Sequence, residues 1–513
     1  MKYLLSVFML ALWMVPLFSQ NEDDPVRVEF SARAEVFELI PCGEQGVLTF
    51  YQSIKNVDES LVAWVFIFYD KNLNPLWSKE IPVNKEFAYQ DFYLQDEAIW
   101  LAFHKTGKVR RDEYNFSLLK LDILTGDWKN ENLFLPPEAS LVDFQIRDEI
   151  FAGGFNYEKD KALLLIRDLN TKTDTPVLFT GTPSYIQTLA FDKYSGDIKV
   201  ALTLYASRKT STLYVNGYNM RGQLQSSVQL TPPHPTQKLL NANLSFVSRS
   251  KTFVLGSYNT MNGNYAHAEE SSMGKEAVGF YIASIEVDEQ KFIRFHNLLN
   301  LKNITDIINN EELAELRQAL EKEKKKGKKQ SLQYPFLMHD LIQQGGNYTL
   351  LAEAYYPEYH QVSTMSYDFY GRPMPYYYSV FDGYRYFNAF VVNFDESGNL
   401  NWSNGIKIWD KRSMRLQQSV EAWHDTSSLV IFYNHEGSII SKVIEGYRQV
   451  GNIEKTRLST IHGGDVQMAS SNGQVRHWYD DYFLAYGYQT LRNNGLGGNS
   501  KRQVFYFNKL VFN

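Results

Sequence analysis

A pattern of short apolar strands separated by tight polar turns recurs along the chain with a period of about 50 residues. Each copy reads as four antiparallel strands, and the second strand begins near residues 47, 98, 150, 198, 252, 348, 428 and 482. The intervals are 51, 52, 48, 54, 96, 80 and 54 residues, so two of them contain insertions. One small meander cannot bury both of its faces alone and must pack against its neighbours. The repeat therefore predicts an all-β protein, a β-propeller of about eight four-stranded blades, with seven blades as the alternative.

The two ends of the chain are expected to meet in one blade. The last copy shows three strands, at 476–479, 482–486 and 503–507, and no fourth. Residues 26–30 alternate between apolar and polar side chains and precede the first complete copy. We expect this N-terminal strand to close the last blade, because closure hides two sheet edges that promote aggregation when they are free. Residues 20–513 then form one propeller rather than the two to four domains that a chain of 513 residues allows.

The turn between the third and fourth strands carries a recurring motif. Asp395, Gly398 and Trp402 form one copy, and Asp70 and Trp77 keep the same Asp-to-Trp spacing. Related turns lie at 122–126 and 218–222. The Asp accepts hydrogen bonds from N–H groups of the turn, Gly or Asn tolerates a positive φ angle, and the Trp packs between blades. These turns resemble those of secreted bacterial β-propellers with degenerate PQQ-like or generic repeats, which are abundant in bacteroidete envelopes. The resemblance implies the fold and transfers no catalytic residue, because the shared motif is structural.

The first 19 residues have the pattern of a secretory signal peptide. Lys2 precedes an apolar run from Leu4 to Phe18, and Ser19 ends this run ahead of an acidic segment. The run is shorter than the roughly 20 residues that a membrane-spanning helix needs. The sole cysteine, Cys42, lies too far downstream to accept a lipid at the cleavage site. We expect an exported protein of the periplasm or cell surface, without a lipid anchor or a transmembrane segment in the mature chain.

Composition excludes several classes of function. The net charge is −6, with 52 Lys and Arg against 58 Asp and Glu, which argues against nucleic-acid binding. A single cysteine excludes an internal disulfide and a Cys-based zinc or iron–sulfur site, and Cys42 is most simply a small core residue. Aromatic residues make up 15% of the chain, so the chain as a whole is not disordered.

Two insertions interrupt the repeat. Residues 300–334 have apolar side chains at spacings of three and four, followed by a Lys-rich tip at 322–329. We expect a helical Lys-rich insertion that packs on the rim of the propeller with a solvated tip, or that docks an acidic partner or anionic lipid head groups.

The second insertion, residues 355–387, contains 13 Tyr or Phe and no Lys. It is expected to form a long hairpin between the second and third strands of the sixth copy, and to project from one face or fold over the central channel. Its rings either pack against the rim, contact a protein partner, or stack on sugar rings, since Tyr offers a large contact area at a small entropy cost. The predicted partner-binding residues are Tyr359, Tyr367, Tyr370, Arg372, Tyr376, Tyr377, Tyr378, Tyr384 and Tyr386.

Motifs for catalysis are missing from the sequence. The ten histidines show no metal-ligand spacing, and no Gly-x-Ser-x-Gly nucleophile elbow occurs. No catalytic residue, metal site or cofactor is therefore predicted. The sequence favours a non-enzymatic exported scaffold or protein-binding subunit of a cell-envelope assembly, which uses the two insertions as contact surfaces. The alternative is a carbohydrate-binding or carbohydrate-active propeller with a carboxylate-based site in the central channel. Convergent carboxylates or histidines in the channel favour the enzyme, and a plugged channel favours the scaffold.

Overall fold

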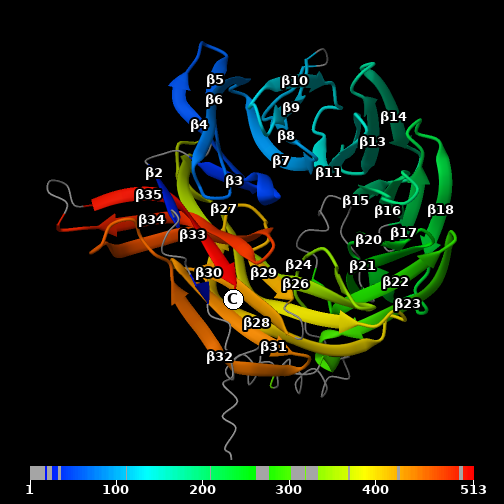
Figure 1. Cartoon of the computed structure of the whole chain (residues 1–513). Helices are drawn as coiled ribbons and strands as arrows, with labels where there is room; N and C mark the ends of the chain where they lie inside the picture. The colour runs from blue at the N-terminus through cyan, green and yellow to red at the C-terminus, as the bar shows by residue number, and fades with distance from the viewer. Residues whose placement is uncertain are drawn as a thin grey trace, which may run out of the picture.

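The computed structural model describes residues 18–19, 26–32, 36–110, 113–207, 210–260, 276–301, 318, 333–367, 370–424, 428–495 and 501–512. These residues form eight antiparallel sheets, which follow one another around a ring (Figure 1). The predicted eight-bladed propeller is therefore confirmed, and the seven-bladed alternative is wrong. No helix in this part of the chain is long and apolar enough to cross a membrane.

We number the blades in chain order. Blade 1 consists of β3 (Phe37–Pro41), β4 (Val47–Asn56), β5 (Leu61–Tyr69) and β6 (Pro75–Asn84), with the 3-10 helix η1 (Gly43–Gln45) after β3. Blade 2 consists of β7 (Phe87–Gln95), β8 (Ala98–Lys105), β9 (Phe116–Asp122) and β10 (Trp128–Leu133). Blade 3 consists of β11 (Ser140–Arg147), β12 (Ile150–Tyr157), β13 (Lys161–Asp168) and β14 (Thr173–Phe179). Blade 4 consists of β15 (Ser184–Phe191), β16 (Ile198–Ser207), β17 (Thr210–Tyr218) and β18 (Leu224–Leu230).

The second half of the ring is less regular. In blade 5, β19 (Gln237–Leu239) and β20 (Asn243–Ser248) share the edge of β21 (Lys251–Thr260), followed by β22 (Gly279–Glu286), β23 (Glu289–Asn297) and η2 (Leu298–Asn300). In blade 6, β24 (Phe336–Met338) and β25 (Ile342–Gln344) share the edge of β26 (Asn347–Tyr367), followed by β27 (Pro373–Phe394) and β28 (Leu400–Ser413). Blade 7 consists of β29 (Val420–His424), β30 (Leu429–His435), β31 (Ser438–Glu445) and β32 (Arg448–Arg457). Blade 8 consists of β33 (Val466–Tyr479), β34 (Tyr482–Arg492) and β35 (Lys501–Phe512), with β1 (Phe18–Ser19) and β2 (Arg27–Ser31) paired to β35.

The hydrophobic core is divided among the contacts between blades. The described residues form eight clusters of buried apolar side chains, and each cluster joins two consecutive blades, including blade 8 to blade 1. In the blade 8 to blade 1 cluster, Phe37 stacks on Phe505 with ring centroids 4.7 Å apart. Each blade therefore gains its stability from two neighbours, as expected for a repeat that cannot bury both faces alone. Cys42 is buried in the cluster between blades 1 and 2, as predicted for a core residue.

The aspartate turns connect neighbouring blades. The Asp395 carboxylate accepts hydrogen bonds from the backbone N–H groups of Ser397 and Asn399, at 2.8 and 2.9 Å. Gly398 has a φ angle of +74°, and an added Cβ would lie 2.6 Å from the Phe292 ring of the preceding blade. Glycine at this position therefore serves both the turn and the close packing between blades. Trp77 donates a hydrogen bond from Nε1 to the carbonyl oxygen of Ile123 in blade 2, at 2.8 Å, which confirms that this Trp packs between blades.

The ring closes where the sequence predicted. β2 pairs antiparallel with β35 in the register Arg27 to Asn508 and Ser31 to Val504, so the N-terminal strand supplies the fourth strand of blade 8. The Arg27 side chain is almost fully buried, and its guanidinium donates hydrogen bonds to Glu29, Ser459, Gln489 and Asn508. It also lies 4.2 Å from the ring centroid of Tyr506. One buried cation thus connects β2 to blades 7 and 8.

Two predicted segments lie largely outside the described residues. The signal peptide, 1–19, is described only at 18–19, and the helical insertion, 300–334, only at 300–301, 318 and 333–334. The hairpin insertion is described except for residues 368 and 369 and the side chain of Tyr367.

We predict that Arg27→Ala lowers the free energy of unfolding by about 2–4 kcal/mol, because several buried acceptors then lose their donor. Urea unfolding followed by tryptophan fluorescence measures this change. Arg448→Ala, at an exposed arginine of β32, is the matched control. It should lower the free energy of unfolding by less than about 0.5 kcal/mol. Equal losses for the two variants would show that Arg27 does not hold the closure.

Candidate functional site

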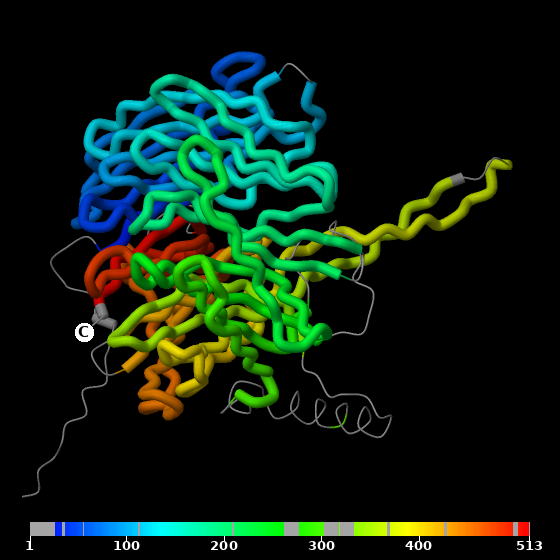
Figure 2. The backbone as a smooth tube through the Cα atoms, turned by 90° about the vertical axis from the view of Figure 1, so that its right-hand side faces the viewer, coloured from blue at the N-terminus to red at the C-terminus, as the bar shows by residue number. Residues whose placement is uncertain are grey.

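The largest departure from the regular ring is a two-stranded hairpin. β26 and β27 are 21 and 22 residues long, and their outer halves extend far from the body of the propeller (Figure 2). They are the second and third strands of blade 6, and of the two expected arrangements the hairpin takes the one that projects from the ring (Figure 2). The last residue of β28 pairs with Tyr384, so the outer part of the hairpin is a ribbon of two strands. We call residues 359–381 the arm.

Both faces of the arm carry exposed apolar side chains. Thr364 pairs with Tyr376 and Val362 with Tyr378, which places these residues on one face, where the two Tyr rings lie 6.2 Å apart. Ser363 pairs with Tyr377 and Met365 with Pro375 on the opposite face. The exposed fractions of the large side chains are 61% at Tyr359, 66% at Met365, 80% at Tyr370, 54% at Met374, 60% at Tyr376, 63% at Tyr377 and 41% at Tyr378.

The inner half of the hairpin belongs to the core. Tyr355 and Tyr386 are fully buried in the cluster between blades 6 and 7. The Tyr386 hydroxyl donates to the carbonyl oxygen of Gln417 at 2.7 Å and accepts from the Gln417 N–H at 2.9 Å. Tyr384 is half-buried between Tyr355 and Phe381, with ring centroids 5.5 and 5.0 Å away.

The predicted binding residues therefore separate into two groups. Tyr359, Tyr370, Arg372, Tyr376, Tyr377 and Tyr378 lie on the exposed arm, and the backbone of Tyr367 lies there too. Tyr386 has no exposed surface, so its role is to hold the 414–419 segment rather than to meet a partner. The interpretation that all the rings pack against the rim fits only the inner half.

The central channel contains the second group of candidate residues. The first strands of blades 2, 3 and 4 each have a register shift in the middle, and Asp91, Asp143 and Thr188 follow the shift in β7, β11 and β15. The three side chains therefore occupy equivalent positions on consecutive blades. The Thr188 hydroxyl donates to Oδ2 of Asp143 at 3.1 Å. Such bulges commonly direct a side chain toward a functional site.

Asp91 and Asp143 thus occupy equivalent positions on neighbouring first strands and interact electrostatically. Burial, with a further contribution from the charge of Asp91, raises the pKa of Asp143 to about 7. Desolvation by burial raises the pKa of Asp91 as well, and the hydrogen bond from the Phe92 N–H opposes this shift.

A connecting segment crosses the channel on another side. Residues 414–419 link β28 to β29, and Arg415 forms an ion pair with Glu38 of β3 and lies 5.9 Å from the ring centroid of Tyr89 of β7. Arg476 of β33 donates from Nη2 to the carbonyl oxygen of Gln418 at 2.7 Å. This segment, which we call the strap, therefore touches blades 1, 2 and 8 as well as the two blades that it joins.

A buried carboxylate anchors the strap. Oε1 of Glu353 accepts hydrogen bonds from Nε2 of His339 at 2.7 Å and from the N–H groups of Ser419 and Val420 at 2.7 and 3.1 Å. Burial lowers the pKa of the neighbouring Lys411 to about 7, and Glu353 opposes this shift. Among the described residues, no group of three or more His, Cys, Asp or Glu is placed to hold a metal ion.

Some of these residues carry a sequence signal and others do not. Asp91 and Asp143 are 52 residues apart, which equals the interval between the second strands that begin at 98 and 150, so aligning the repeats would have identified them. Glu353 has no such signal, because its partners lie directly after β24, in the strap and at the start of β29. His339, likewise without a sequence signal, is the buried partner of Glu353.

We predict that Asp143→Asn removes the loss of folding stability that accompanies ionisation of Asp143. The raised pKa means that the folded state binds this proton more tightly, so ionisation destabilises the fold as pH rises from about 4 to 7. In urea unfolding, the free energy of unfolding of the variant should equal that of the parent at pH 4 and exceed it by roughly 1–3 kcal/mol at pH 8. Asp481→Asn, at an exposed turn, is the control. The same difference from the parent at both pH values would contradict the assignment.

Comparison with known proteins finds only distant structural similarity among the matches described below. No family model and no curated protein sequence matches the chain. Solved structures similar to it include the polysaccharide lyase Uly1, at 10% identity and a TM-score of 0.38, over 84% of this chain and 92% of that one. The β-propeller domain of the Trilobed protease from Pyrococcus furiosus matches at 10% identity and a TM-score of 0.33, over 82% and 96%. Oligopeptidase B from Leishmania major matches at 7% identity and a TM-score of 0.37, over 91% and 54%. These matches carry no argument about this chain, whose eight-bladed β-propeller fold rests on its own sheet topology.

Proposed function

We propose that this protein is a non-enzymatic propeller that binds a protein partner through its arm, as an exported subunit of a cell-envelope assembly. The observation that carries the proposal is an arm with exposed rings on both faces. A two-stranded hairpin is only marginally stable alone in water, so a partner that buries the rings would also stabilise the ribbon. Tyrosine suits this role, since it loses little entropy on binding and combines a large apolar surface with a polar tip.

The arrangement of the rings also bears on the shape of the partner. Tyr376 and Tyr378 lie on one face and Tyr377 on the other, so a flat surface would cover the rings of only one face. A partner with a cleft that receives the arm buries both faces. The inner half of the hairpin, held by Tyr355 and Tyr386, fixes the base of the arm on the ring. The apolar leader at 1–19 supports export, and the strap across the channel supports a scaffold rather than an open active site.

The test is to shorten the arm without disturbing its base. Residues 361–379 are replaced by Asn-Gly, which joins the cross-strand partners His360 and Val380 through a two-residue turn. We expect the tagged parent protein to be recovered from the envelope fraction with a specific partner, and the shortened protein to lose that partner at an unchanged melting temperature.

A triple variant with serine at 376, 377 and 378 tests the rings themselves, and Tyr447→Ser, at a residue that is 52% exposed on blade 7, is its control. We expect the triple variant to reduce partner recovery at least tenfold and the control to leave it unchanged. A partner that the shortened protein retains in full would refute the proposal.

A carbohydrate-active channel is the second candidate, and the paired carboxylates Asp91 and Asp143 favour it. This candidate requires the parent protein to cleave a polysaccharide and Asp143→Asn to abolish cleavage. If the parent protein cleaves none of a panel of polysaccharides at pH 5 to 8, the carbohydrate-active channel is rejected and the scaffold proposal is retained.

A further inference from the structure

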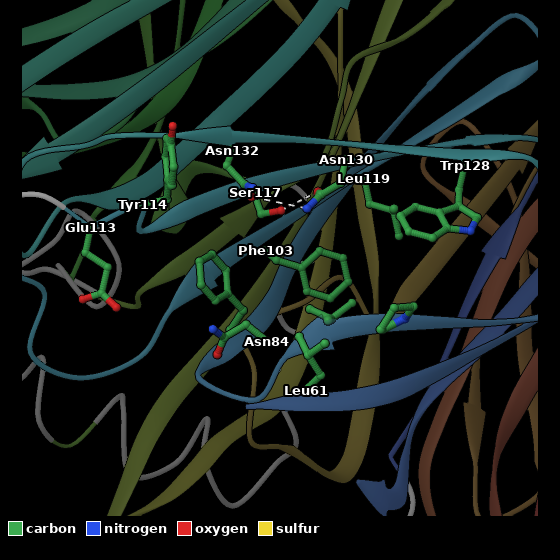
Figure 3. A pocket seen from close by; sticks show the side chains of 13 residues that line it. Leu61, Asn84, Phe103, Glu113, Tyr114, Ser117, Leu119, Trp128, Asn130 and Asn132 are labelled. Carbon is green, nitrogen blue, oxygen red and sulfur yellow. Dashed lines mark hydrogen bonds between the residues drawn. The ribbon is translucent and has the colours of Figure 1, made fainter. Parts of the chain in front are cut away.

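A groove between blades 1 and 2 has the features of a ligand site. Its volume is about 310 Å³, and it is lined by side chains of β5 and β6 on one wall and of β8, β9 and β10 on the other. This volume is at the lower end of the roughly 300–1,000 Å³ that is typical of small-ligand pockets. Figure 3 shows Trp128 at one end and Tyr114 at the other, with Asn130 and Asn132 between them.

One strand supplies an aromatic ring and two amides in a row. Trp128, Asn130 and Asn132 alternate along β10 and share one face, which is turned toward blade 1. The Trp128 side chain is 42% exposed although it is one of the most apolar groups of the groove. Phe103 and Leu119 form part of the apolar surface between the ends (Figure 3). An exposed Trp beside amides is an apolar platform with polar groups at its edge.

The polar groups leave hydrogen-bond donors for a ligand. The Ser117 hydroxyl donates to Oδ1 of Asn130 at 2.6 Å, and Nδ2 of Asn130 donates to Oδ1 of Asn132 at 3.3 Å. On the opposite wall, Oδ1 of Asn84 accepts from the Glu86 N–H at 2.9 Å. The amide nitrogens of Asn84 and Asn132 donate no hydrogen bond within the described residues. Two neutral donors thus lie on facing walls.

The groove offers little charge to a ligand. Glu113 is the one ionisable carboxylate among its lining residues, and it shares Lys105 with Glu86, at 2.5 and 2.9 Å. An anionic ligand would therefore find no free counter-ion here, because the nearby cation is already held by two carboxylates. A neutral ligand with oxygen acceptors and a flat apolar face fits both the amides and the ring.

We propose that this groove binds a neutral carbohydrate, with one sugar ring stacked on Trp128 and sugar oxygens accepting hydrogen bonds from Asn84 and Asn132. About 310 Å³ holds roughly 20 to 30 water-sized groups, which corresponds to about two sugar rings. The site lies on blades 1 and 2, whereas the arm lies on blade 6, so it is independent of the proposed partner surface.

The experiment is calorimetric titration of the full-length folded protein with uncharged di- to tetrasaccharides of glucose, xylose, mannose, galactose and N-acetylglucosamine. We expect at least one of these series to bind with a Kd below about 1 mM. Trp128→Ala should weaken that binding at least about tenfold, and Asn132→Leu, which keeps the volume and removes the amide, about fivefold. Trp409→Ala, at a Trp that is 55% exposed on blade 6, is the matched control and should leave the affinity unchanged.

The arm-shortened protein should keep its full affinity for the saccharide, so failure here is distinguishable from failure of the partner-binding proposal. Absence of binding across all five series would overturn the proposal, as would equal effects of Trp128→Ala and Trp409→Ala. Preference for anionic tetragalacturonate over every neutral tetrasaccharide would also overturn it.

Discussion

The pairing of β2 with β35 is the interaction on which the rest of the structure depends. Every other blade is built from consecutive strands, whereas blade 8 needs strands from both ends of the chain. The buried Arg27 strengthens this pairing, since its guanidinium bonds to groups of β34, β35 and the segment after β32. Without closure, the edge of β35 and the apolar faces of blades 8 and 1 would be open to solvent.

A closed ring explains how the chain tolerates its irregular parts. Each blade packs on two neighbours through its own cluster, so a long hairpin between two strands of blade 6 extends outward without removing a core contact. The strap runs inward rather than outward. Arg415 and Glu353 hold it at fixed positions around the channel. The arm, the carboxylates of Asp91 and Asp143 and the groove at Trp128 thus lie at separate places on one rigid ring.

Repetition made the architecture predictable from the sequence, and the lack of repetition limited the prediction of sites. All eight second strands begin within one residue of their predicted positions, since alternation and polar turns recur in every copy. The exposed Tyr residues of the arm were also identified, because their density has no parallel elsewhere in the chain. The sequence assigned Tyr386 to the same exposed surface. Tyr386 is buried and Tyr376 is exposed because β28 covers β27 at Tyr386 and ends before it reaches Tyr376, and no local pattern in the sequence shows where β28 ends. The groove at Trp128 was missed, as its walls come from two blades whose relative placement no local pattern reveals.

The measurement that tests ring closure most directly is hydrogen–deuterium exchange of the intact protein, followed by mass spectrometry of peptides that contain residues 27–31. The closed ring predicts that these amides exchange as slowly as those of β34, since β2 opens only when blade 8 unfolds. Exchange of 27–31 within seconds, beside slow exchange in β34, would contradict the account and show that the N-terminal strand is not part of the folded ring.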